Sequence, residues 1–409
     1  MNPERTNISR WEKGMMILLG AVFLLPLVLT GLLKCFPEQV SGFLHPWVQN
    51  KTLKGTQLAE TPVAFSWESL AAAKYQDSLA KQFDKGFAGR EALIRWTNEA
   101  YLQWFNEPSS KSSTLAVGKN RWLFEKVYLE EYFLDRIDKS VLVPFANDLA
   151  ELQKKYRAKG KGFVVLLSPS KVAAYPEEAP SGWQARNNPK PRAITQMMEL
   201  CSERGVAFVN GPEIARLEGV KKAKRPSFPV GGIHWMDHCS MAATNKLLEM
   251  LQAQGVKVQQ IPNEIRKKND IYRGGLRDRD LLELLNIAIP WSYPANRAIV
   301  TPVSNPATPR PRGCAVGGSF TFPVLEQLRH SRQLEELYFY YYYTTQLMRY
   351  TDDSYKTVAQ PVPPVKFETD VFGADFIILE INEEVLSKPV NHLRAFVADM
   401  VNSLNAHGL

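Results

Sequence analysis

Two short segments carry the residue types needed for nucleophilic chemistry. Gly-Ile-His-Trp at 232–235 offers the imidazole of His234, and Gly-Gly-Ser-Phe at 317–320 offers the hydroxyl group of Ser319 in a glycine-rich turn. A serine becomes an effective nucleophile when a nearby base takes its proton. Acyl transfer also needs N–H donors aimed at the developing oxyanion, and the small Gly317 and Gly318 let the backbone approach it. The pair therefore indicates serine–histidine acyl chemistry.

Each segment also has an ordinary structural interpretation. Ser319 could simply close a tight turn before a helix that begins near Pro323, and His234 could be a core histidine beside Trp235. An acidic partner for the imidazole is not obvious nearby. Asp237 could orient His234, although its place before a predicted helix over 237–254 favours a role as N-cap.

The elements around these segments alternate between apolar strands and amphipathic helices. Strands are predicted at 114–117, 122–124, 162–167, 206–209, 312–316 and 375–380, and helices at 141–159, 191–204, 237–254, from 323 and over 389–405. Continuous apolar runs are typical of strands buried on both faces. We therefore predict an α/β layered domain over 114–409 with a mainly parallel sheet. In such sheets, functional groups gather at the carboxyl ends of strands, and both segments are predicted to lie at strand-to-helix junctions.

The first third of the chain has a different character. Residues 14–33 form an uncharged run of 20 residues, long enough to cross a bilayer as a helix. More basic residues precede this run than closely follow it, which predicts a cytoplasmic tail at 1–13 and export of the rest. We interpret 14–33 as an uncleaved signal anchor, 34–61 as a connector and 62–113 as a helical region, broken near Gly86 and Gly89, that packs on the main domain.

Composition narrows the partners further. The 45% hydrophobic share is ordinary for a folded protein, and the net charge of +8 favours an acidic partner. No nucleic-acid-binding motif is present, so nucleic acid is not an expected partner. The aromatic run 338–343 could be core or could stack on sugars. Cys239 and Cys314 could be linked if the two segments meet, although buried free thiols are the commoner arrangement.

Six segments, in order, resemble one known family. They are 118–124 (Gly-Lys-Asn-Arg-Trp-Leu-Phe), 168–171 (Ser-Pro-Ser-Lys), 175–177 (Tyr-Pro-Glu), 232–235, 317–320 and 375–380 (Asp-Phe-Ile-Ile-Leu-Glu). On these the chain resembles the SGNH-hydrolase-like O-acetyltransferases of bacterial exopolysaccharide systems, the AlgJ/AlgX-type group that includes alginate O-acetyltransferases. The resemblance implies Ser319 as nucleophile and His234 as general base. The family's aspartate two residues before the histidine is Gly232 here, and its aspartate before the serine is Gly318.

The resemblance also implies a function and partners. It predicts a periplasmic acyltransferase, anchored in the inner membrane, that moves acetyl groups from a membrane-bound O-acyltransferase to a polysaccharide without metal or cofactor. Candidate substrate contacts are Trp235, Lys171 and Tyr341. A noncatalytic accessory protein of an acetylation or secretion complex, and a carbohydrate esterase, are the alternatives. The glycine at 232 favours the accessory alternative, because an acid normally fixes the histidine tautomer.

Overall fold

The computed structural model describes most of the chain after residue 61. The described residues are 53–55, 62–86, 90–109, 113–134, 136–218, 226–268, 271–272, 278–289, 291, 293–294, 297–304, 306, 309–388 and 391–409, with residues 11, 14–17, 24, 28 and 32. The chain divides into two compact units. One comprises Met1–Lys111 with Glu283–Pro290, and the other comprises Ser112–Leu282 with Trp291–Leu409.

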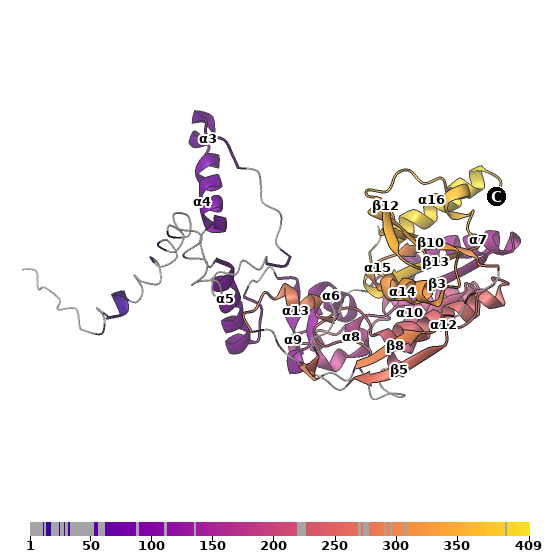
Figure 1. Cartoon of the computed structure of the whole chain (residues 1–409), viewed down its shortest axis with the longest axis horizontal. Helices are drawn as coiled ribbons and strands as arrows, with labels where there is room; N and C mark the ends of the chain where they lie inside the picture. The colour runs from indigo at the N-terminus through magenta and orange to yellow at the C-terminus, as the bar shows by residue number, and fades with distance from the viewer. Residues whose placement is uncertain are drawn as a thin grey trace, which may run out of the picture. The chain divides into compact units, whose positions relative to one another are not determined.

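A seven-stranded sheet forms the centre of the larger unit (Figure 1). Its order is β12 (Tyr355–Ala359), β11 (Gln346–Tyr350), β10 (Glu336–Tyr341), β9 (Arg312–Gly317), β13 (Phe376–Asn382), β3 (Gly162–Ser168) and β4 (Phe208–Asn210). The strands from β10 to β4 are parallel, whereas β11 and β12 are antiparallel at one edge. The predicted α/β fold with a mainly parallel sheet is confirmed.

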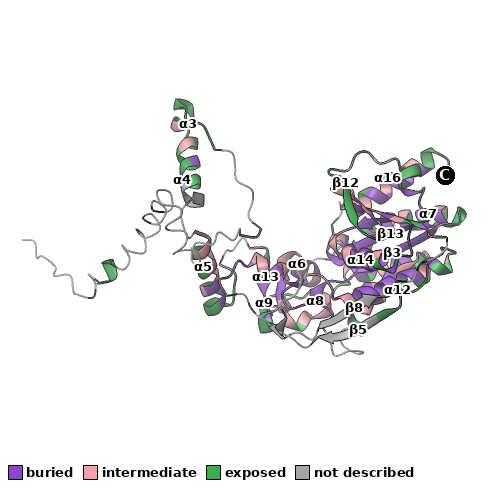
Figure 2. Ribbon diagram, viewed as in Figure 1, coloured by how far each residue is buried: buried purple, intermediate pink, exposed green. Residues whose placement is uncertain are grey.

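Helices cover both faces of this sheet. In β3, Phe163, Val165 and Leu167 join the core under α7 (Val143–Ala158), α10 (Ala193–Glu203) and α16 (His392–Ala406). Val164 and Leu166 face the opposite core, which includes α11 (Gly211–Arg216), α12 (Asp237–Ala253) and α14 (Phe322–Ser331). Figure 2 shows that β3 and β13 are buried between these layers, whereas the edge strand β12 is exposed. Because successive side chains of a strand point to opposite faces, one apolar run serves both cores.

Shorter elements complete the larger unit and its connections. They are the antiparallel hairpin β1 (Leu115–Val117) and β2 (Leu123–Glu125), α6 (Lys126–Phe133), α8 (Lys171–Ala174), α9 (Ser181–Gln184), α13 (Asp280–Leu284), α15 (Glu383–Leu386), the pair β5 (Asn263–Lys268) and β8 (Arg297–Pro302), and the pair β6 (Ile271–Tyr272) and β7 (Tyr293–Pro294). The sequence interpretation anticipated β1 and β2 but missed β5, β8 and the antiparallel edge strands, whose polar and short runs lack a continuous apolar signal.

The smaller unit is helical. It contains α3 (Trp67–Ala71), α4 (Lys74–Gly86) and α5 (Arg90–Phe105). Ser66 begins α3 with a reciprocal capping box to Ser69. On α5, the Asn98 side-chain amide donates to the carbonyl oxygens of Leu285 and Asn286 at 2.9 and 3.1 Å. The segment 283–290, far along the chain, therefore belongs to this unit.

The predicted signal anchor at 14–33 lies mostly outside the described residues. In the part of the chain that the structure describes, no helix combines the length and the apolar character needed to span a membrane.

Candidate active site

The Ser319 turn is built at the carboxyl end of β9. Gly317 ends the strand, a 3₁₀ turn spans Ser319–Thr321, and α14 follows. Glu380 of the neighbouring strand β13 accepts from the Gly318 N–H at 2.7 Å and from the Thr321 hydroxyl at 3.2 Å. A Cβ on Gly317 would lie 2.6 Å from the same carboxylate oxygen. Only glycine lets Glu380 come close enough to hold the turn.

Glu380 is the buried anchor of this turn. Its side chain is 1% exposed, and burial raises the pKa of its carboxyl group above the usual value. Hydrogen bonds from Ser168, Gly318 and Thr321 oppose that shift, as does the nearby His234. A buried carboxylate with several donors is stable enough to fix the backbone around it. Ser319 is thus presented in a rigid setting, half-buried itself.

His234 lies in a loop that precedes α12. No strand is described between β4 and this loop, so the predicted strand-to-helix junction at His234 is wrong; β4 leads into α11 instead. The imidazole Nδ1 lies 2.9 Å from Asp280 Oδ2, and Asp280 Oδ1 accepts from the Ile233 N–H at 2.9 Å. Asp280 therefore binds both the imidazole ring of His234 and the backbone of Ile233.

Asp280 is the acid that the sequence interpretation missed. It comes 46 residues after His234, as the first residue of α13, where its Oδ1 also accepts from the Leu281 N–H at 2.8 Å. The Leu282 N–H donates to the Gly231 carbonyl oxygen at 2.9 Å and docks the start of α13 on the same loop. An aspartate directly before the leucine-rich segment 281–285 was the available signal, because such residues favour helix starts. Sequence spacing alone gave no reason to pair it with His234.

Lys171 holds the histidine loop through hydrogen bonds to its backbone. Its ammonium group donates to the carbonyl oxygens of Leu123, Val230 and Gly232, each at 2.8 Å. The residue is 3% exposed, and burial lowers the pKa of Lys171 well below its usual value, a shift that Asp280 opposes. All three donors of the ammonium group are used. Lys171 is therefore a structural clip for the loop, which corrects its assignment as a substrate contact.

His234 contacts Phe320, the residue that directly follows Ser319. The rings of His234 and Phe320 are 5.1 Å apart between centroids. His234 Nε2 is buried and has no hydrogen-bond partner within the described part of the chain, and Ser319 makes no hydrogen bond to it. Catalytic hydrogen bonds are often open in a site without substrate. The nitrogen opposite Asp280 is thus the one left to exchange a proton.

One N–H of the glycine-rich turn is already used. The Gly318 N–H donates to Glu380 at 2.7 Å, so Gly318 supplies no free oxyanion donor. The Ser319 N–H opens the 3₁₀ turn, and an N–H in the first turn of a helix has no intrahelical acceptor. The Ser319 N–H is therefore a candidate oxyanion donor.

The other predicted site residues lie elsewhere. Asp237 is the first residue of α12, with Met236 as the N-cap, and Asp280 rather than Asp237 holds His234. Trp235 is 2% exposed and belongs to the core under α12 and α14. The ring of Tyr341 packs on Phe322 of α14, with centroids 5.2 Å apart. Trp235 is therefore a core residue and not a substrate contact.

Cys239 and Cys314 are buried free thiols, so the alternative of a bridge between them is excluded. Burial raises the pKa of both thiols, which keeps them protonated and unreactive. Within the described residues, no three His, Cys, Asp or Glu side chains gather closely enough to hold a metal ion.

A pocket of about 320 Å³ opens beside Ser319. Its lining comes from the Ser319 turn, the end of β13, α15 and the start of α16: Tyr128, Gly318, Ser319, Phe320, Tyr342, Glu380, Asn382, Glu384, Val385, Lys388, Asn391 and His392. A Cβ on Gly318 would meet the Tyr342 ring at 3.1 Å. The tyrosine ring therefore leaves little room for a side chain at position 318.

The larger unit thus combines a layered α/β fold with a serine turn and a histidine–aspartate pair. Residues 115–308 match the family model of the SGNH hydrolase-like domain of the acetyltransferase AlgX. This match confirms the resemblance to SGNH-hydrolase-like acetyltransferases found in the sequence. The matched segment includes His234 and Asp280 and ends before Ser319.

Three solved structures are similar to the chain, each with a TM-score below 0.5. The O-acetyltransferase domain of Pseudomonas putida AlgJ is 15% identical, covers 71% of this chain and 99% of its own, with a TM-score of 0.46. Pseudomonas aeruginosa AlgX is 13% identical over 71% of this chain and 67% of its own, with a TM-score of 0.41. Bacillus cereus PatB1 is 8% identical over 68% and 98%, with a TM-score of 0.41. No curated protein sequence matches the chain.

Proposed function

We propose that this chain is an O-acetyltransferase that carries an acetyl group on Ser319 and delivers it to a hydroxyl group of an extracellular polysaccharide. His234 is the general base, and Asp280 orients it. The observation that carries the proposal is the 2.9 Å contact between His234 Nδ1 and Asp280 Oδ2, which leaves Nε2 as the nitrogen without a partner.

In the first half-reaction, Ser319 Oγ attacks the carbonyl carbon of an acetyl ester, and its proton passes to His234 Nε2. The carbonyl oxygen becomes negative and is stabilised by the Ser319 N–H. The carbonyl then re-forms, the donor's alcohol leaves, and that alcohol takes the proton from His234. An acetyl-serine remains, and the histidine returns to its neutral form.

In the second half-reaction, a sugar hydroxyl group replaces the donor. Its oxygen attacks the acetyl-serine carbonyl while His234 Nε2 accepts its proton. Ser319 Oγ leaves and recovers that proton, so the enzyme is restored and the sugar carries the acetate ester. Throughout, Asp280 keeps Nδ1–H as the donor tautomer and stabilises the imidazolium ion that forms twice.

Asp280 also bears on the accessory-protein alternative. That alternative drew its support from the glycine at 232, where the resembling family has its acid. An acid delivered from α13 supplies the same contact to the imidazole, so the glycine no longer argues against catalysis.

The location and donor belong to the same proposal. The apolar run 14–33, with basic residues before it, would anchor the chain in the inner membrane with the catalytic unit in the periplasm. A membrane-bound O-acyltransferase would bring acetyl groups across the membrane and pass them to Ser319.

The full chain, purified in detergent and mixed with an activated acetyl ester, tests the proposal. We expect intact-mass spectrometry to detect one acetyl group on Ser319, and neither Ser319→Ala nor His234→Ala to acquire it. Ser181→Ala, an exposed serine of α9, is the matched control and should be labelled like the unchanged chain. Equal labelling of Ser319→Ala would refute the acyl-enzyme.

Transfer and hydrolysis are separated in the same assay by adding an oligosaccharide. A transferase passes the acetyl group to the sugar faster than free acetate appears. Release of acetate at a rate independent of the sugar would instead establish the esterase alternative.

A further inference from the structure

The pocket beside Ser319 carries more negative than positive charge. Glu380, Glu384 and Lys388 are its acidic and basic residues, and Lys388 is already ion-paired with Glu384 within α15 and its end. Glu380 is bound by neutral donors only, from Ser168, Gly318 and Thr321. Once these contacts are made, the lining offers no cation that is free to meet an anionic group.

The remaining imidazole of the pocket is neutral. Burial and the nearby Lys388 lower the pKa of His392 to about 4. Its Nε2 is buried without a hydrogen-bond partner among the described residues, and its ring meets Tyr342 edge-on with centroids 4.8 Å apart. A neutral imidazole both donates and accepts, and an aromatic ring offers an apolar face to a sugar. This pair suits hydroxyl groups and C–H faces better than a carboxylate.

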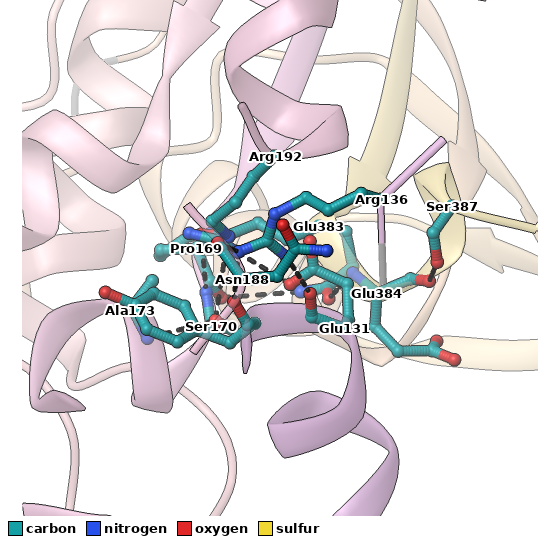
Figure 3. Close-up of polar contacts among 12 residues, drawn as sticks. Glu131, Arg136, Pro169, Ser170, Ala173, Asn188, Arg192, Glu383, Glu384 and Ser387 are labelled. Atoms are coloured by element: carbon teal, nitrogen blue, oxygen red, sulfur yellow. Dashed lines mark hydrogen bonds and ion pairs between the residues drawn. The ribbon is translucent and has the colours of Figure 1, made fainter. Parts of the chain in front are cut away.

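Arg192, the arginine paired with the residue before Glu384, is also engaged in ion pairs. Arg192 pairs with both Glu131 and Glu383, and Glu383 directly precedes the pocket residue Glu384 (Figure 3). Glu383 additionally accepts from the Ser170 N–H at 3.0 Å. Two carboxylates share the guanidinium group of Arg192. The network holds α15 in place, and its one arginine does not offset the charge of the pocket.

Glu125 is a further carboxylate that interacts with this region. Burial, Asp280 and Glu384 raise the pKa of Glu125, and His234 lowers it. The acidic residues of the pocket lining therefore outnumber its one lysine, although the whole chain has a net charge of +8.

We propose that the acetyl acceptor at Ser319 is an uncharged sugar unit, and that the pocket discriminates against uronates through Glu380 and Glu384. The proposal rests on the proposed function, because it names the acceptor of the second half-reaction. A uronate carboxylate in this pocket would lose water and meet like charges without a free cation, whereas a neutral hexose would keep hydroxyl partners. The basic residues elsewhere on the chain do not change this local balance.

Two acceptors of equal length test the proposal with the full chain in detergent and the same acetyl ester. One is a neutral glucose tetramer, and the other is a mannuronate tetramer. We expect acetyl transfer to the neutral tetramer to exceed transfer to the uronate at least about tenfold, as repulsion by one nearby carboxylate predicts. Product mass spectrometry gives both rates.

Glu384→Gln sharpens the test, because it removes one acid and releases Lys388. We expect the ratio of uronate to neutral transfer to rise about tenfold. Glu335→Gln makes the same charge change at an exposed position and should leave the ratio unchanged. A salt titration provides a second measurement, since the preference for the neutral tetramer should weaken as ionic strength screens the repulsion.

The outcomes separate the two proposals. Equal transfer to both tetramers, or preference for the uronate, overturns the neutral-acceptor proposal while acetyl-Ser319 still forms. Acetyl-Ser319 that is only hydrolysed, with neither tetramer labelled, also overturns it and leaves the acyl-enzyme intact. Absence of acetyl-Ser319 would remove the proposed function and this inference with it.

Discussion

The serine turn and the histidine loop each position one side chain of the candidate site, but different kinds of contact hold the two segments. Ser319 is placed by its own neighbours in sequence, because β9, two glycines and α14 define the turn and Glu380 anchors it. His234 lies in a loop held by two distant residues, Asp280 and Lys171. The turn that carries Ser319 is thus formed by adjacent sequence and anchored by one distant residue, whereas the loop of His234 has no flanking strand and depends on distant residues alone.

One tetrapeptide connects the two regions. At the carboxyl end of β3, Ser168 donates to Glu380 below the serine turn, and Lys171 donates to the Gly232 carbonyl oxygen of the histidine loop. Ser170 binds Glu383, which precedes the pocket residue Glu384. The segment after β3 therefore contacts the supports of both the serine turn and the histidine loop.

The largest effect is expected from removing the carboxylate that holds His234. Asp280→Asn should lower the rate of Ser319 acetylation by about 10³–10⁴-fold, because an asparagine cannot stabilise the imidazolium or enforce the tautomer. Stopped-time mass spectrometry measures the rate, and the pH profile should change shape as well as height. Asp237→Asn, the matched control on α12, should stay near the unchanged chain.

An exchange of acids makes this prediction more specific. Gly232→Asp added to Asp280→Asn would return the acid to the position used by the resembling family, and we expect partial recovery of the rate. A rate for Asp280→Asn within a factor of about three of the unchanged chain would show that Asp280 is not the orienting acid.

The next effect tests the serine side. Gly317→Ala should lower the acetylation rate about 100-fold, since a displacement near 1 Å is enough for such a loss. The new methyl group would lie 2.6 Å from both Glu380 Oε2 and Thr321 Oγ1. Gly182→Ala is a suitable control because its added Cβ meets nothing within 4 Å. Activity retained in Gly317→Ala would mean that the turn is less rigid than its packing indicates.

Lys171→Met should separate stability from chemistry in the histidine loop. The change removes the Lys171 donor from three carbonyl oxygens, of which Val230 keeps the Leu123 N–H at 3.0 Å, so we expect the free energy of unfolding to fall by about 3 kcal/mol. Urea denaturation measures it, with the exposed Lys159→Met as control. The acetylation rate should fall less than in Asp280→Asn. Unchanged stability would contradict the role of Lys171 as a clip.

The smallest effect is expected in the ion-pair network of Glu131, Arg192 and Glu383, and it concerns the pH dependence of stability. Burial raises the pKa of Glu131 to about 7, against the attraction of Arg192. Because the folded chain holds this proton more tightly, the stability it contributes is present below the ordinary pKa of 4.5 and is lost as pH rises towards 7.

Glu131→Gln should therefore flatten the fall in the thermal midpoint between pH 5 and pH 8, by a few degrees. Glu130→Gln, its exposed neighbour on α6, is the control and should follow the unchanged chain. Parallel curves for Glu131→Gln and the unchanged chain would contradict the proton assignment, and the loss of acetylation expected in either reactive region should not occur here.

Much of the fold was predictable because its signals are periodic and local. The apolar runs at 162–167, 312–316 and 375–380 became β3, β9 and β13, and the amphipathic stretches became α7, α10, α12 and α16. The polar strands β5 and β8 and the antiparallel edge were missed, because pairing with a neighbour, rather than apolar content, makes them strands.

The site divides in the same way. Sequence order identified Ser319 and His234, but it offered Asp237 as the acid and Lys171 and Trp235 as substrate contacts. Those errors share one cause, since proximity in sequence was used where burial and long-range contacts decide. Glu380, Asp280 and His392 gave no local sign of their roles.

The sequence by itself determined the layered fold and pointed to Ser319 as the proposed nucleophile, because both inferences follow from short-range patterns of apolar residues and glycines. The tertiary structure alone decided which acid serves the histidine and which charges surround the acceptor. A carboxylate's partner depends on distances of about 3 Å across packed elements, and a spacing of 46 residues carries no information about such a distance.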